Sequence, residues 1–137
     1  MKNNVPAAAN GCFVCGPDNP IGLKIQFKLK EGKCIGEFTP TANHVGFYDI
    51  VHGGILFAVL DDAMANWFYL QGSIGYTARA EIRYKQPLRV GDTALISCCL
   101  IQQKGSLLFL KSELINKLNK KVIAQSEGKF LIDKNSQ

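Results

Sequence analysis

The stretch HGGILFAVLDDAMANWFYL, residues 52–70, decides the fold of this chain. After His52 it is apolar apart from two adjacent aspartates and one asparagine, and it lacks the roughly 20 uninterrupted apolar residues that a bilayer crossing requires. Gly72 follows it, at a position where helices commonly stop. The stretch therefore predicts a core helix over residues 54–70, and a helix this apolar needs cover on nearly every side.

Outward from this helix, period-two alternation indicates strands on both sides. Residues 23–30 and 34–39 precede a loop over 40–51, and four strands are expected after the helix, at 77–85, 93–103, 106–116 and 121–132. The pattern predicts an α+β fold, a six-stranded curved antiparallel sheet wrapped around one long central helix. We expect a single domain over 12–133, with a flexible arm at 1–11 and a tail at 134–137.

The strand directly after the helix is amphipathic. Its alternation predicts Ala78, Ala80, Ile82 and Tyr84 on one face. The other face should carry the residues between them, which are Thr77, Arg79, Glu81, Arg83 and Lys85.

Composition narrows the class of protein. A chain of 137 residues with 47% hydrophobic and 20% charged residues suits one globular domain. The net charge of +5 favours an anionic partner, but the cations are scattered among acids, so a small phosphorylated ligand fits better than nucleic acid. Five cysteines, an odd number, favour reduced thiols, and residues 1–11 do not look like a secretory signal. We therefore expect a cytoplasmic protein that does not bind a membrane.

The chemistry is expected at the start of the helix. The first N–H groups of a helix lack intrahelical acceptors and carry a partial positive charge, so the turn His52-Gly53-Gly54 can stabilise a carbonyl oxygen that gains negative charge. The alternative is a tight loop whose glycines serve only the backbone shape. Asp61 in the apolar helix should have a raised pKa, which suits a general base.

Gly53 and Asp61 are too far apart to act together within one chain. They are separated by eight residues, which is about 12 Å along a helix axis. The simplest arrangement is a symmetric dimer in which each site takes the glycine turn from one subunit and the acid from the other.

Two segments resemble the hotdog-fold acyl-CoA thioesterases of the PaaI-like branch. They are CFVCGPDNPIGL, residues 12–23, and Val51-His52-Gly53-Gly54 with Leu60-Asp61-Asp62-Ala63-Met64 on the helix. The similarity runs from about residue 11 to residue 132. It implies thioester hydrolysis without a cofactor, with coenzyme A as part of the substrate. It also implies homodimers joined at the strand after the helix, which often pair into homotetramers.

The resemblance also implies roles for single residues. Gly53 matches the glycine whose N–H polarises the thioester carbonyl, and Asp61 matches the general base or nucleophile from the opposite subunit. Thr77 matches a hydroxyl that positions water or the carboxylate, and His52 positions the turn. Some relatives carry an amide side chain where this chain has Gly46.

Further residues are predicted to bind the substrate. They are Gly54, His44 and Asn43 near the turn, Asp62 on the helix as an interface or hydrogen-bonding residue, and Arg79, Arg83, Lys85 and Arg89 for the phosphates of coenzyme A. A solvated strand face would explain these cations equally simply.

A metal is not expected. Cys12-x-x-Cys15 has no second pair at a suitable spacing, although His44 is a conceivable third ligand.

Two other functions remain open from the sequence. One is an acyl-CoA-binding protein of the same fold without catalysis, and the other is a hydratase or dehydratase that uses a histidine and an acid.

Overall fold

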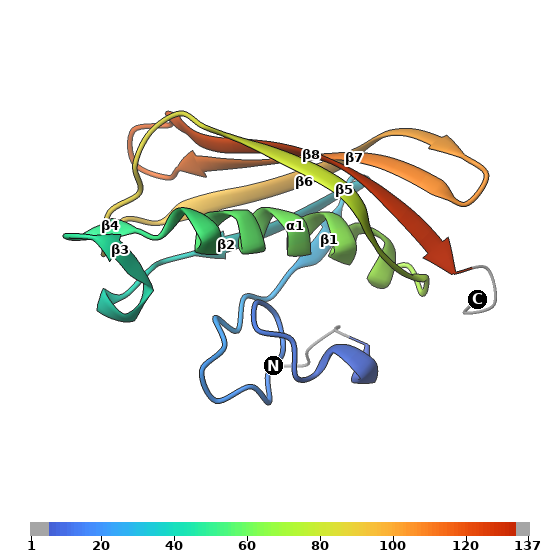
Figure 1. Ribbon diagram of the computed structural model, residues 1–137, viewed down its shortest axis with the longest axis horizontal. Coiled ribbons are helices and arrows are strands. Elements are labelled where there is room, and N and C mark those ends of the chain that lie inside the picture. The colour runs from blue at the N-terminus through green and yellow to red at the C-terminus, as the bar shows by residue number, and fades with distance from the viewer. Residues whose placement is uncertain (1–5, 134–137) are drawn as a thin grey trace.

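One long helix lies against one face of a six-stranded antiparallel sheet in the computed structural model, which describes residues 6–133 (Figure 1). The helix, α1, spans Gly53–Tyr69. The strand order is β1-β2-β6-β7-β8-β5. The bounds are Lys28–Lys30 for β1, Lys33–Phe38 for β2, Ile74–Tyr84 for β5, Ala94–Lys104 for β6, Leu107–Asn116 for β7 and Val122–Asp133 for β8. This is the layered arrangement that the sequence predicts.

The predicted loop over residues 40–51 contains short elements of its own. A 3₁₀ helix, Ala42–His44, leads into the antiparallel pair of β3, Val45–Phe47, and β4, Ile50–Val51. A second 3₁₀ helix, Ala7–Ala9, lies within the predicted arm, whose first five residues are outside the described part, as is the predicted tail at 134–137.

Helix α1 fits closely against the middle of the sheet. Phe68 is 2% exposed and meets Phe130 of β8 with ring centroids 5.6 Å apart. A Cβ at Gly128 of β8 would lie 2.7 Å from the Phe130 ring and 3.0 Å from the Met64 methyl, so only a glycine lets the helix approach this closely. None of the helices in residues 6–133 is long and apolar enough to span a membrane.

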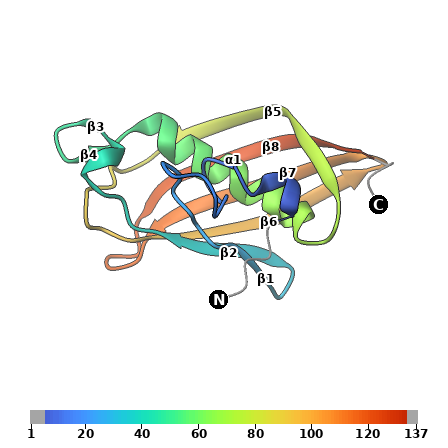
Figure 2. The same ribbon diagram turned by 90° about the horizontal axis from the view of Figure 1, so that it is seen from below.

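The N-terminal segment covers the face of α1 opposite the sheet (Figures 1 and 2). The predicted strand over residues 23–30 is therefore wrong in its first half, because only β1 at its end pairs with the sheet. The Leu23 and Ile25 N–H groups donate instead to the carbonyls of Phe13 and Val14. Ile25 is nevertheless buried in the core, as its place in the alternation indicates.

Strand β5 is an edge strand with a bulge. Its partner register runs from Thr77 opposite Phe130 directly to Arg79 opposite Lys129, so Ala78 is an extra residue. The bulge reverses the alternation at this point, since two residues oppose one on the partner strand. Thr77 therefore lies on the helix side together with Tyr84, and the predicted placement of Thr77 on the opposite face is wrong.

Candidate active site

His52 caps α1 and organises the turn. Its ring Nδ1 accepts the Gly54 N–H at 2.9 Å, and its carbonyl accepts the N–H groups of Ile55 and Leu56. The sequence-based role of His52 as a positioning residue fits these contacts. Within residues 6–133, the Gly53 N–H has no hydrogen-bond acceptor. The backbone donor that the sequence predicts is therefore free to bind a substrate oxygen.

Tyr84 of β5 holds the first turn of the helix in place. Its hydroxyl donates to the Gly53 carbonyl at 2.8 Å. A Cβ at Gly53 would lie 3.3 Å from that hydroxyl, so the phenol packs tightly against the glycine. Sequence reasoning missed this contact, although the alternation of the strand had already placed Tyr84 on the face that meets the helix.

Asp61 lies half-buried on α1 and faces β5. The Thr77 hydroxyl donates to its Oδ1 at 2.7 Å, so the structure brings the predicted acid and the predicted hydroxyl together. Burial raises the pKa of the Asp61 carboxyl, and the Thr77 hydrogen bond opposes that rise. Gly53 and Asp61 remain eight residues apart on one continuous helix, so a single protomer does not bring them to one carbonyl.

Asp62 points away from Asp61 and lies under the N-terminal segment. It accepts the Cys12 thiol at 3.5 Å and the Asn66 amide at 3.0 Å. Burial raises the pKa of the Asp62 carboxyl, the Cys15, Cys12 and Asn66 hydrogen bonds oppose that rise, and the charge of Asp61 adds to it. These contacts fit the hydrogen-bonding role that the sequence indicates for Asp62, on the side of α1 that meets the N-terminal segment.

His44 and Asn43 lie beside the turn. The His44 carbonyl accepts the His52 N–H at 2.9 Å, and its ring Nδ1 accepts the Thr41 N–H at 2.9 Å. Asn43 is exposed, and its side chain is available to a ligand at the surface. Gly46 packs on His52, because a Cβ there would lie 3.2 Å from the His52 Cα.

The four predicted phosphate-binding cations do not form one cluster. Arg79 and Arg83 pair in register with Lys129 and Gln125, on the face of the sheet away from α1. Arg89 lies close to the turn, because it bridges to Ile50, and its guanidinium donates to Asp49 at 2.8 Å. Lys85 is exposed just beyond the end of β5.

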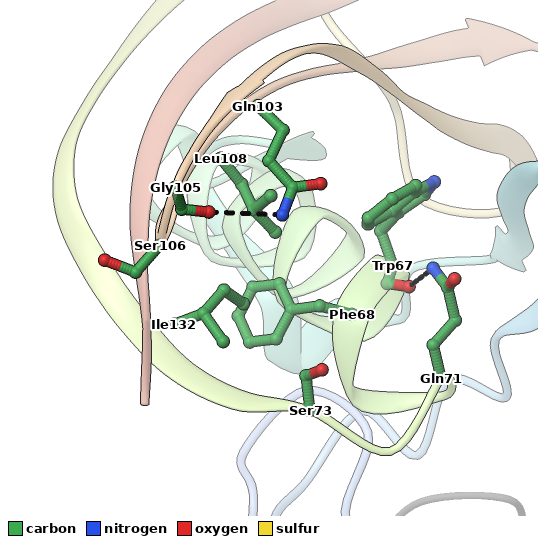
Figure 3. Close-up of a pocket in the computed structure, with 9 residues that line it drawn as sticks. All are labelled: Trp67, Phe68, Gln71, Ser73, Gln103, Gly105, Ser106, Leu108 and Ile132. Atoms are coloured by element: carbon green, nitrogen blue, oxygen red, sulfur yellow. Dashed lines mark hydrogen bonds between the residues drawn. The ribbon is translucent and has the colours of Figure 1, made fainter. Parts of the chain in front are cut away.

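A cavity of about 360 Å³ opens at the other end of the helix (Figure 3). Trp67 and Phe68 contribute to its wall together with Gln103, Leu108 and Ile132 from the sheet. It lies about 20 Å along the helix axis from Gly53, so it is separate from the glycine turn.

The sequence model of the thioesterase superfamily matches residues 48–123, more than half of the chain. The chain belongs to the thioesterase superfamily. The matched range holds the glycine turn, Asp61 and Thr77, whereas the Cys12–Cys15 segment precedes it.

Relatives of this thioesterase-superfamily chain agree with that assignment. Human acyl-coenzyme A thioesterase 13 is 29% identical over 96 residues, which cover 69% of each chain. The PaaI protein of the E. coli phenylacetic acid degradation operon superposes with a TM-score of 0.73 at 26% identity, over 80% of this chain and 79% of that one. The hotdog fold implied by the sequence resemblance is confirmed.

A second similar structure carries a ligand. A Streptococcus mutans protein bound to acetyl CoA superposes with a TM-score of 0.73 at 19% identity, over 80% of this chain and 88% of that one. At this identity the likeness supports the fold of the thioesterase-superfamily chain.

Proposed function

We propose that this protein hydrolyses acyl-CoA thioesters to a free acid and coenzyme A, at a site shared between the two subunits of a homodimer. Membership of the thioesterase superfamily and the name of the human relative support the reaction class. The observation that carries the proposal is that one apolar helix holds both groups: it begins with the unpaired Gly53 N–H, and it carries the half-buried Asp61 carboxyl. The Asp61 carboxyl accepts a hydrogen bond from Thr77 of β5. The bound acetyl CoA of the Streptococcus mutans protein supports the class of substrate.

Gly53 supplies the electrophilic half of the site. As water attacks the thioester carbon, the carbonyl oxygen gains negative charge and accepts the Gly53 N–H at the positive end of the helix. The neighbouring Gly54 N–H is already used by His52, which leaves Gly53 as the donor for the substrate. The Tyr84 hydrogen bond to the Gly53 carbonyl holds the next peptide, between Gly53 and Gly54, and so fixes the first turn of the helix.

Asp61 of the other subunit supplies the carboxylate. It takes a proton from the attacking water, or attacks the carbonyl carbon itself and forms an anhydride that water then opens. In both routes the carbon–sulfur bond breaks, and the coenzyme A sulfur leaves as a thiolate and is protonated. The raised pKa of Asp61 makes its carboxylate a stronger base than an exposed aspartate.

The dimer is expected to form along β5. This strand is 11 residues long and pairs with β8 on one side only within the described part of the chain. Long unpaired edges are commonly covered by another chain. Tyr76 and Tyr84 leave 61% and 52% of their surfaces exposed beside this edge, as an interface would require. Two such dimers pair further into a homotetramer in this proposal, and the protein is cytoplasmic.

The two histidines of the chain speak against a hydratase. Both ring Nδ1 atoms accept backbone N–H groups, from Thr41 to His44 and from Gly54 to His52, so each ring serves to hold its loop. Water addition to an enoyl-CoA is accordingly not expected.

Release of free thiol from a panel of short, medium, long and aryl acyl-CoA thioesters tests the proposal. The wild type should release thiol from at least one of these substrates, and Asp61→Asn should abolish turnover without changing the mass of the oligomer. Asp18→Asn, at an exposed loop position, is the matched control and should retain activity. Full activity of Asp61→Asn would remove the acid from the mechanism, and an inactive wild type that still binds the thioesters would favour a binding protein.

A further inference from the structure

A second group of reactive side chains meets on the other side of α1 from the sheet. The Sγ atoms of Cys12 and Cys15 and a carboxylate oxygen of Asp62 all lie within 4.8 Å of one another. Cys15 is completely buried, and Asp62 is 9% exposed. The group therefore lies inside the protein, where the N-terminal segment crosses the helix (Figure 2).

The loop between the two cysteines is shaped around the first sulfur. The N–H groups of Val14 and Cys15 both point at the Cys12 Sγ, at 3.4 and 3.5 Å. Gly16 closes the loop with an N–H to the Cys12 carbonyl at 2.9 Å. A Cβ at Gly16 would lie 2.3 Å from the Cys12 nitrogen, so the tight turn requires a glycine.

Among residues 6–133, the buried carboxyl of Asp62 has no cationic partner. The ion pairs found among residues 6–133 are Arg89 with Asp49 and Lys117 with Glu37, and neither involves Asp62. Burial alone favours the protonated form of this carboxyl, whereas a bound metal ion would hold it as the carboxylate. A divalent cation between the carboxylate and the two sulfurs would supply the missing positive charge.

Asn66 supports the same group and carries an unsatisfied atom. Its amide nitrogen lies 3.0 Å from the Asp62 Oδ2 and 3.6 Å from the Cys15 Sγ. Asn66 is completely buried, and its Oδ1 has no hydrogen-bond partner, the one such buried side-chain atom in the described part of the chain. An amide that orients two ligands is the kind of partner that metal sites place behind their ligands.

We propose that this protein holds a zinc ion on Cys12, Cys15 and Asp62. In tetrahedral zinc sites two sulfur ligands are about 3.8 Å apart, and a sulfur and an oxygen are about 3.6 Å apart, given the usual bond lengths. The Cys12 Sγ and the Asp62 Oδ1 already lie at 3.5 Å. Two thiolates and one carboxylate form a ligand set that suits zinc better than magnesium or calcium. The fourth position is left to water or to the Asn66 amide oxygen.

The zinc ion is structural in this proposal. Its binding releases the two thiol protons to solvent and fastens the N-terminal segment to α1 at the residue next to Asp61. The spacing of Cys12 and Cys15 alone could not reveal the site, because the third ligand is 50 residues from Cys12 in the sequence. The sequence-based alternative, His44, is not part of the group.

Metal analysis of the full chain tests this site directly. Protein produced in zinc-containing medium and purified without chelators should contain one zinc ion per protomer by mass spectrometric elemental analysis. Cys15→Ser should lose the metal, and Asp62→Asn should bind zinc at least about 10-fold more weakly in competition with a chromophoric chelator. Cys99→Ser, at a half-buried position in the middle of β6, is the matched control and should keep the full zinc content.

Cobalt substitution tests the site without an activity assay, and its first measurement is made on the wild type, which carries no destabilising mutation. The cobalt-loaded wild type should show thiolate-to-cobalt charge-transfer absorption, and Cys12→Ser, at a half-buried position, should show about half of it because one of two thiolates is lost. A wild type that takes up neither zinc nor cobalt would overturn the proposal. A Cys12–Cys15 disulfide in the purified protein, seen by mass spectrometry without reduction, would also overturn it.

Discussion

At the scale of single residues, the Gly53 peptide can be tested without disturbing the helix. Gly53 is the first helical residue, where proline is well tolerated, and His52 before it has φ −57° and ψ 129°, values that a residue preceding proline readily adopts. Gly53→Pro therefore removes the N–H, and it adds ring atoms at a position where a Cβ would lie 3.3 Å from the Tyr84 hydroxyl. We expect kcat to fall by about 100- to 1000-fold, the usual effect of removing one oxyanion donor.

Gly53→Ala is the matched control because it keeps the N–H and adds only a Cβ against Tyr84. It should retain most of the activity measured by thiol release. Equal losses in the proline and alanine variants would show that shape, and not the hydrogen bond, matters at this position.

The Thr77 hydroxyl is predicted to lower the pKa of the Asp61 carboxyl. Its hydrogen bond favours the ionised form of Asp61 and so lowers the pKa that burial raises. Thr77→Val removes this contribution, so the Asp61 pKa should rise and the acidic limb of the profile of kcat/KM against pH should move to higher pH. The rate at neutral pH should fall by about 10- to 100-fold, as expected for one hydrogen bond to a charged group. An unmoved acidic limb would separate Thr77 from the titration of Asp61.

At the scale of elements, the closeness of α1 and β8 depends on Gly128. Gly128→Ala places a methyl group against Met64 and Phe130, and such overpacking costs about 1–3 kcal/mol. We expect a lower urea midpoint with an unchanged slope. Gly11→Ala, where a Cβ would meet nothing within 4 Å, should leave the midpoint unchanged. Equal midpoints in the two variants would mean that the helix has room to move away.

Elements whose signal is local could be predicted from the sequence. The helix, its start at the glycine turn, and the last three strands follow from periodicity and turn residues, and the structure places them within a few residues. The two errors arose from long-range effects. Because of the bulge at Ala78, Thr77 lies on the helix side of β5. Residues 23–27 lie outside the sheet because their N–H groups bind the Cys12–Cys15 loop instead of a neighbouring strand. The alternation of apolar and polar residues cannot predict the bulge or the hydrogen bonds to the loop.

The candidate site could be predicted to the same extent. Gly53, His52 and Asp61 lie on one helix, so their relative placement follows from helical geometry. The contacts of Tyr84 and Asp62 join segments that are distant in sequence, with separations of 31 residues from Gly53 and 50 residues from Cys12. Contacts between such distant segments depend on the tertiary packing, so the sequence pattern did not predict them.

At the scale of the whole molecule, the proposed mechanism requires that two subunits share each reaction centre. A hybrid dimer of a Gly53→Pro chain and an Asp61→Asn chain contains one site with both defects and one site with neither. If instead each site were built from a single chain, both sites of the hybrid would carry a defect. Two different affinity tags and two successive purifications, carried out at a concentration at which tetramers dissociate into dimers, isolate this hybrid from the parent homodimers.

Thiol release by the purified hybrid is the most direct measurement. The shared site predicts about half of the wild-type activity per dimer, since one of two symmetric sites is intact, whereas both parent homodimers should be inactive. A hybrid as inactive as its parents would contradict the account.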